Sequence, residues 1–228
     1  MIECVLAPNP GPMTGTGTNT WLVPNGSGEL AVIDPGPDDP AHIDAIVKAA
    51  EPLGRIRAVL VTHRHGDHLP AALPLSERTG AQLFGHADLP GVQRALADGE
   101  TAFGTLKALQ TPGHTPESVC YFDPTSGALF TGDLVAGVGT VVVDQLGPYM
   151  ASLERLLTFE PRTIYPGHGP VVQDAIGKLQ EYLDHRRQRE RQVLAGLPAT
   201  IDQLTAKIYT DVPSNLVPMA ARNVSACL

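Results

Sequence analysis

The stretch VTHRHGDHL, residues 61–69, places three histidines and an aspartate within six positions, directly after an apolar run. Neighbouring imidazoles repel each other when they are protonated, whereas a bound cation holds them in the neutral form. His63 and His65 are two residues apart, so on an extended segment their side chains point the same way. The crowding of titratable groups therefore favours a metal site over a polar loop that is merely rich in histidine.

Three further motifs carry possible ligands at the ends of predicted strands: His114 in TPGHT, Asp133 in TGD and His168 in YPGHGP. Each alone fits a turn or a surface loop, and only the set is specific. Imidazole and carboxylate ligands without thiolate suit zinc or a similar first-row divalent ion. His63, His65 and His114 can form one site, and Asp67, His68 and His168 a second, with Asp133 between them. Two adjacent cations acidify a bound water and polarise the electrophilic oxygen of a substrate.

Short runs rich in Val, Ile, Leu and Phe, bounded by turn residues, predict a series of strands. They cover 29–36, 56–63, 81–86, 105–113, 118–123, 128–134, 139–144 and 162–169. Apolar residues at helical spacing predict helices over 39–54 and 149–160. Strands grouped around intervening helices are typical of a layered α/β protein.

The composition changes after Gly169, and the rest of the chain is predicted to be helical. Helices are expected over 174–197 and 200–210, and the final segment is compatible with a third. Thr200 and Gln203 form a capping-box pair at the start of the second helix. We therefore predict a catalytic domain over residues 1–170 and a small helical appendage over residues 171–228.

The net charge of −8 and the pI near 5.4 provide no general attraction to nucleic acid or to an anionic membrane. No run approaches the roughly 18 apolar residues that span a bilayer, so we expect no membrane partner. The opening segment MIECVLAPNPGPMTG has neither a basic start nor a long apolar core, and the three cysteines are scattered. These features predict a cytoplasmic protein without a disulfide framework.

The motif HxHxDH at 63–68, followed by TPGHT, TGD and PGHG, resembles the metallo-β-lactamase superfamily. The resemblance implies an αββα sandwich with the metal site at one edge, between the two sheets. The implied set of five histidines and two aspartates is similar to that of glyoxalase II and ribonuclease Z. It implies two zinc ions per chain, with Mn²⁺ or Fe²⁺ as alternatives, held by His63, His65, Asp67, His68, His114, Asp133 and His168.

Longer stretches resemble the β-lactamase-like protein 2 (LACTB2-like) group: 9–23 (NPGPMTGTGTNTWLV), 139–157 (GTVVVDQLGPYMASLERLL) and 164–194. In that group the C-terminal appendage resembles a winged helix, whose opening 200–228 fits. Because the chain ends at Leu228, we expect the end of the third helix and the β-hairpin wing to be absent, which leaves a truncated winged-helix-like appendage.

Two functions are consistent with this metal core. The first is a dinuclear zinc-dependent hydrolase in which a metal-bridging hydroxide attacks an ester, thioester or lactam-like substrate, a small acyl molecule. The alternative is an endoribonuclease that acts on single-stranded RNA. The only basic run is HRRQRER at 185–191, and helix 174–197 contains five positive and four negative residues, which is nearly neutral. A non-catalytic protein on a decayed hydrolase fold ranks lowest because all seven ligands are present.

Four residues are candidates for roles beyond metal binding. Asp67 can orient the hydroxide or receive its proton. Tyr149 follows a Gly-Pro turn before a helix and is a candidate substrate contact, although packing is an equally good interpretation. Arg64 and Asn19 are further candidate substrate contacts. The sequence leaves the natural substrate and the oligomeric state open.

Overall fold

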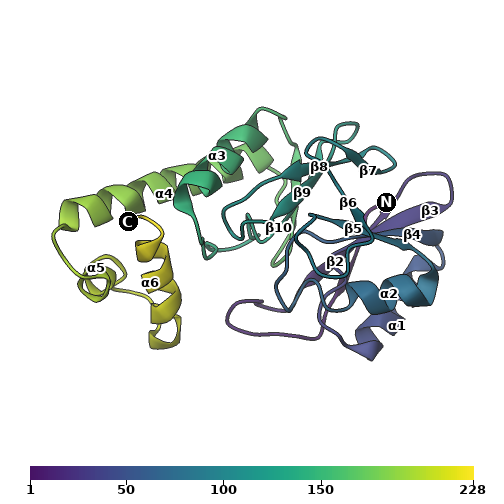
Figure 1. The fold of residues 1–228 in the computed structure, drawn as a ribbon, viewed down its shortest axis with the longest axis horizontal. Helices are drawn as coiled ribbons and strands as arrows, with labels where there is room; N and C mark the ends of the chain where they lie inside the picture. The colour runs from purple at the N-terminus through teal and green to yellow at the C-terminus, as the bar shows by residue number, and fades with distance from the viewer.

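Two β-sheets lie face to face in the computed structural model, which describes residues 1–228 (Figure 1). The first sheet has the order β1 (Glu3–Leu6), β2 (Asn19–Pro24), β3 (Glu29–Ile33), β4 (Arg55–Leu60), β5 (Gln82–Gly85) and β6 (Arg94–Ala95). The second has the order β11 (Thr163–Pro166), β10 (Ala128–Gly132), β9 (Val119–Asp123), β8 (Leu106–Gln110) and β7 (Thr101–Phe103). Strands β3, β4 and β5 are parallel, and so are β10 and β11.

Helices cover both outer faces. The first sheet packs against α1 (Pro40–Ala50) and α2 (Ala72–Thr79), and the second against α3 (Leu146–Leu157) and α4 (Ala175–Gly196). Side chains alternate between the layers because a strand has a period of two: on β9, Val119 and Tyr121 point between the sheets, while Cys120 and Phe122 point toward α3 and α4. The αββα sandwich is therefore confirmed.

Seven of the eight predicted strands form, with shorter bounds, whereas the strand predicted over 139–144 is wrong. This segment is a loop whose backbone groups bond to side chains instead of to a neighbouring strand: Tyr182 and Arg186 donate to its carbonyls, and Asn223 accepts from an N–H. Val141 and Val143 are buried against the outer face of the second sheet. A run of β-branched residues therefore served packing here without strand pairing.

The strands β1, β2, β6 and β7 and the helix α2 were not predicted. The helices predicted over 174–197, 200–210 and the final segment form as α4, α5 (Ile201–Ile208) and α6 (Val217–Ser225), with a short 3₁₀ turn at Ser214–Leu216. In Figure 1, α4 extends away from the sandwich, and α5 and α6 lie toward its far end.

The helix α4 belongs by packing to both parts of the molecule. Its first half contributes Leu179 and Tyr182 to the core outside the second sheet. Further along, Val193 forms a small cluster with Leu204 and Val224 of the other two helices. The boundary near residue 170 stays a prediction. None of the helices combines the length and the apolar character that crossing a membrane requires.

Candidate metal centre

All seven candidate ligands lie where strands end. His63, His65, Asp67 and His68 follow β4, His114 follows β8, Asp133 follows β10 and His168 follows β11. The strands β8, β10 and β11 run in the same direction, because β9 is antiparallel to both β8 and β10 and β10 is parallel to β11. Their carboxyl ends therefore meet at one edge, opposite the end of β4, and the topology gathers side chains from both sheets.

The first group of ligands consists of His63, His65, His114 and Asp133. The Nδ1 atom of His65 lies 2.9 Å from His63 Nε2 and 3.0 Å from His114 Nε2. Asp133 Oδ2 lies 4.0 Å from His63 Nε2 and 3.8 Å from His114 Nε2. Three ring nitrogens and one carboxylate oxygen thus converge on one point.

The second group consists of Asp67, His68, His168 and again Asp133. Asp67 Oδ2 lies 3.1 Å from His168 Nε2, and the Nε2 atoms of His68 and His168 are 3.3 Å apart. Asp133 Oδ1 lies 3.4 Å from His68 Nε2 and 3.3 Å from His168 Nε2. The two carboxylate oxygens of Asp133 therefore face one group each.

These groups fit divalent metal ions. Within each group the ligand atoms all lie within 4.8 Å of one another. Asp133 Oδ1 is buried and has no hydrogen-bond partner, a condition that is costly unless a cation accepts the lone pair. Ligand bonds of about 2.0–2.2 Å to zinc place neighbouring donors roughly 3.3 Å apart, close to the separations observed. The site therefore supports a divalent metal cofactor.

Hydrogen bonds behind the ligands fix the orientation of four imidazoles. The second ring nitrogen, Nδ1 in each case, lies against an oxygen: Thr62 Oγ1 for His63 at 3.0 Å, Asp34 Oδ2 for His68 at 2.9 Å, Val142 O for His114 at 2.7 Å and Gly17 O for His168 at 3.2 Å. A proton held on Nδ1 leaves the Nε2 lone pair free for a metal, as in other metal-binding histidines.

Asp34 lies behind the candidate metal centre and was not among the residues predicted from the sequence. It directly follows β3, is 2% exposed and has a φ of +51°, a rare conformation for a residue other than glycine. Its carboxylate accepts hydrogen bonds from the backbone and hydroxyl of Thr62 at 2.8 and 2.7 Å and pairs with His68. The signal was available in AVIDPG, where a carboxylate closes an apolar strand, as Asp133 does.

The pKa shifts of the histidines have opposite directions in the two groups. Burial lowers the pKa of His63 well below its usual range, and burial together with His114 lowers that of His65. Burial also disfavours a charge on His168, but the adjacent carboxylates of Asp133 and Asp67 outweigh burial and raise its pKa to about 9. The carboxylates of Asp133 and Asp34 raise the pKa of His68 well above its ordinary value in the same way. In the second group, protons therefore bind the histidine nitrogens that would otherwise face a metal cation.

Two of the three candidate substrate contacts make structural contacts near the metal centre. The Arg64 guanidinium donates to both oxygens of Glu117, whose side chain is 0% exposed. Arg64 and other donors outweigh burial and lower the pKa of Glu117 to about 2. Asn19 Nδ2 donates to the carbonyls of Pro166 and Gly169, on either side of His168. Both residues hold ligand-bearing loops, and substrate contact by either stays a prediction.

Tyr149, the third candidate, is buried in the core outside the second sheet, and its hydroxyl donates to Leu134 O at 2.7 Å. Its backbone also packs against Gly113, where a Cβ atom would approach Tyr149 Cα to 2.4 Å. The TPGHT turn therefore requires glycine beside α3. Tyr149 supports the segment that carries His114, and its contact with substrate stays a prediction.

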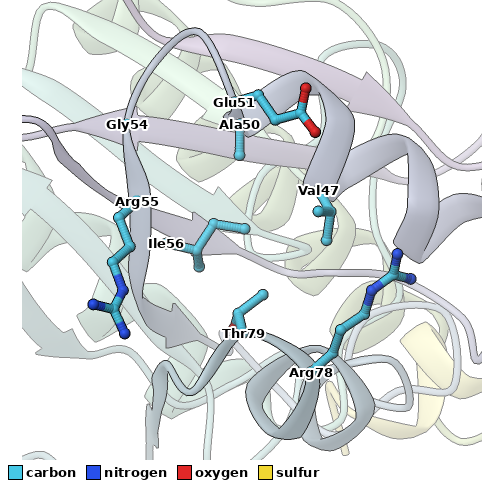
Figure 2. A pocket seen from close by; sticks show the side chains of 8 residues that line it. All are labelled: Val47, Ala50, Glu51, Gly54, Arg55, Ile56, Arg78 and Thr79. Atoms are coloured by element: carbon cyan, nitrogen blue, oxygen red, sulfur yellow. The ribbon is translucent and has the colours of Figure 1, made fainter.

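A surface hollow of about 270 Å³ lies away from this centre (Figure 2). It is lined by Arg55 and Ile56 at the start of β4, by Val47 of α1 and by Arg78 and Thr79 of α2. The metal ligands follow the opposite end of β4. The hollow therefore contributes nothing to the chemistry of the metal centre.

Comparisons with known proteins agree with the site. The profile of the metallo-beta-lactamase superfamily matches residues 13–99 and 87–168, and that of the beta-lactamase associated winged helix domain matches residues 200–228. A Drosophila melanogaster protein named beta-lactamase-like protein 2 homolog is 33% identical over 97% of this chain and 84% of its own length. An Aspergillus chevalieri protein named atrochrysone carboxyl ACP thioesterase is 35% identical over 93% of this chain and 74% of its own.

Solved structures show the same fold. A metallo-beta-lactamase family protein from Thermus thermophilus superposes with a TM-score of 0.81 at 22% identity, over 100% of this chain and 91% of its own. A structure described as di-iron-bound is 27% identical, with a TM-score of 0.60, over 76% of this chain and 96% of its own. Fold, site and relatives together define a metal-dependent hydrolase. The chain belongs to the metallo-beta-lactamase superfamily and is similar over most of its length to the LACTB2-like proteins.

Proposed function

We propose that this chain is a dinuclear zinc-dependent hydrolase of a small ester, thioester or lactam-like substrate. The observation that carries the proposal is Asp133, whose two oxygens face two separate ligand groups and one of whose oxygens is otherwise without a partner. His63, His65 and His114 would hold one ion, and Asp67, His68 and His168 the other. Bound there, the ions would acidify a water and polarise the substrate's carbonyl oxygen.

The protein's own groups prepare this reaction. The hydrogen bonds that four imidazoles donate to Thr62, Asp34, Val142 and Gly17 hold the rings in place before substrate arrives, so no reorientation is needed during turnover. Asp67 has a side chain that is 26% exposed, against 15% for Asp133. An accessible carboxylate at the rim of the site is suited to receive the proton of the attacking water.

The charge of α4 supports a small acyl substrate over RNA. In the run 185–191, Arg186 is buried against Val141 O, and Arg187 pairs with Glu154 and Asp184. Arg189 packs on Tyr209 and donates to Ile208 O. Phosphate binding needs several free cations on one face, whereas these three arginines serve internal contacts and only Arg191 of the run is exposed without an ion pair. The relative named as a thioesterase also supports acyl chemistry. The proposed partner is therefore a small acyl molecule. The proposed location of the enzyme is the cytoplasm.

A substrate panel tests the proposal on one sample with measured zinc content. We expect about two zinc ions per chain and turnover of a glutathione thioester, a lactone or a chromogenic β-lactam that varies little with salt. Chelation should abolish turnover, and added zinc should restore it. Cleavage of single-stranded RNA that weakens steeply with added salt, without acyl turnover, would support the endoribonuclease instead. An active metal-free protein would contradict both.

A further inference from the structure

The loop of residues 136–145, called here the bridging loop, contacts one ligand of each metal group. The Gly137 N–H donates to the carbonyl of His168 at 2.8 Å, and Val142 O accepts from His114 Nδ1 at 2.7 Å. The N–H groups of Asp144 and Gln145 both donate to Gly113 O, at 2.9 and 3.1 Å, next to His114. The geometry of this loop therefore determines how two ligands are held.

Side chains from the C-terminal helices hold the bridging loop from its other side. Asn223 Oδ1 of α6 accepts from the Val143 N–H at 3.0 Å, and Arg222 pairs with Asp144 at 2.6 Å. From α4, Tyr182 donates to Gly139 O at 2.9 Å, and Arg186, which is 3% exposed, donates to Val141 O. A loop without strand partners thus obtains part of its hydrogen bonding from side chains of the C-terminal helices.

One contact reaches a metal ligand through a single peptide group. The carbonyl of Val142 and the N–H of Val143 belong to the same peptide bond, which is planar and stiff. Asn223 fixes the N–H end of this plane, and His114 Nδ1 donates to its carbonyl end. A hydrogen bond accepted from the N–H also polarises the peptide and makes its carbonyl a better acceptor. The proton on His114 Nδ1 is thereby held in place, and the Nε2 lone pair stays directed into the site.

We propose that Asn223 is a positioning residue for the metal ligand His114, acting through the peptide group that joins Val142 and Val143. The C-terminal helices are accordingly part of the metal centre and not a separate attachment. This series of hydrogen bonds involves protein atoms alone. The expected effect of Asn223 on metal affinity rests on the proposed function.

Three variants separate positioning from general packing. Asn223→Leu removes the acceptor at similar volume, and Asn223→Asp retains an oxygen acceptor. Val224→Ala weakens the small cluster under the same helix, where Val224 is 1% exposed, without touching the bridging loop. If Asn223→Leu does not fold, Asn223→Ala serves in its place. The readouts are Co²⁺ affinity and visible spectrum, and the exchange rate of the His114 Nδ1 proton in metal-free protein by NMR.

We expect Asn223→Leu to weaken Co²⁺ binding about 3- to 10-fold, which is at or below the low end of the loss seen when a residue hydrogen-bonded directly to a metal ligand is changed. We also expect it to speed exchange of the His114 Nδ1 proton about tenfold. Asn223→Asp should restore both values, and Val224→Ala should lower the melting temperature while leaving both unchanged. Wild-type values in Asn223→Leu, or equal changes in Val224→Ala, would overturn the proposal. If the wild type binds no Co²⁺, the proposed function fails, and the proton exchange still decides the role of Asn223.

Discussion

Asp133 is the residue on which both ligand groups depend. Its oxygens face different groups, and its carboxylate is held by strand β10, which sits in the interior of the second sheet between β9 and β11. Gly167 shows how tightly this position is built, because a Cβ atom there would lie 2.7 Å from Asp133 Oδ1 and 2.6 Å from His68 Cε1. At the scale of single residues, close packing and charge together define the site.

The variant Asp133→Ala should therefore weaken metal binding in both ligand groups. We expect metal content to fall from about two ions toward zero to one, and turnover to fall by at least about a thousandfold, since both groups lose a ligand. Metal analysis after dialysis and a thioester assay measure the two effects. Circular dichroism should show an intact fold. Full zinc content with unchanged turnover would remove Asp133 from the site.

The ion pair of Glu117 and Arg64 predicts a dependence of stability on pH. The pKa of Glu117 is lowered from 4.5 to about 2 in the folded protein, so its contribution is complete above pH 4.5 and is lost as the pH falls toward 2. Because Arg64 is half-exposed, screening weakens the pair, and we expect Glu117→Gln to cost about 1–2 kcal/mol at neutral pH.

Denaturant unfolding of metal-free protein between pH 2.5 and 7 measures this effect without interference from loss of metal. The free energies of unfolding of wild type and Glu117→Gln should differ at neutral pH and converge as the pH falls. A constant difference across the range would show that Glu117 acts through packing alone.

At the scale of elements, the segment that carries His114 depends on its contact with α3. Gly113 has a φ of +142°, and an added Cβ atom would lie 2.4 Å from Tyr149 Cα and 2.7 Å from its N. Ser152 of the same helix donates to Pro112 O at 2.8 Å. The close packing of this turn against α3 therefore fixes the backbone position from which the His114 side chain extends into the site.

Gly113→Ala should destabilise the protein by about 2–4 kcal/mol. The positive φ of this position is unfavourable for alanine, and the added Cβ atom would clash with the backbone of Tyr149. Gly147→Ala, in the first turn of α3, is the matched control, since nothing lies within 4 Å of its added Cβ atom. That change should be neutral or stabilising by up to about 1 kcal/mol. Thermal unfolding measures both, and equal effects of the two changes would contradict the role given to Gly113.

The sequence allowed the grouping of the candidate ligands to be predicted because His63, His114 and His168 each stand beside turn residues at the end of an apolar run. The layered fold followed from the same runs. The bridging loop was misassigned because Val141 and Val143 are as suitable for burial in a loop as in a strand. Its contact with Asn223 could not be predicted, since it depends on how α6 returns to the sandwich.

At the scale of the whole molecule, metal binding and protonation compete. Without metal, His168 has a pKa of about 9 and His68 a pKa well above its usual range, because the carboxylates around them favour the charged imidazoles. An ion must displace these protons before the nitrogens can bind it. The second group is therefore occupied by protons when it is not occupied by metal.

We expect zinc binding at pH 7 to release more than one proton per chain, and the affinity for zinc to fall as the pH is lowered. Calorimetric titrations in buffers with different ionisation enthalpies measure the release directly. His168→Asn should reduce it, whereas the surface variant Lys207→Ala should not. Binding without proton release would show that the second group is not involved.

The ligands come from both sheets: four follow β4 in the first, and three follow β8, β10 and β11 in the second. An ion bound there is consequently a cross-link between the two layers, and its binding free energy adds to the free energy that holds the native state together. Copies that lose their ions would open more readily at this edge and would be degraded sooner. The lifetime of the protein would in this way depend on whether its metal centre is occupied, so that copies able to bind metal would persist longer.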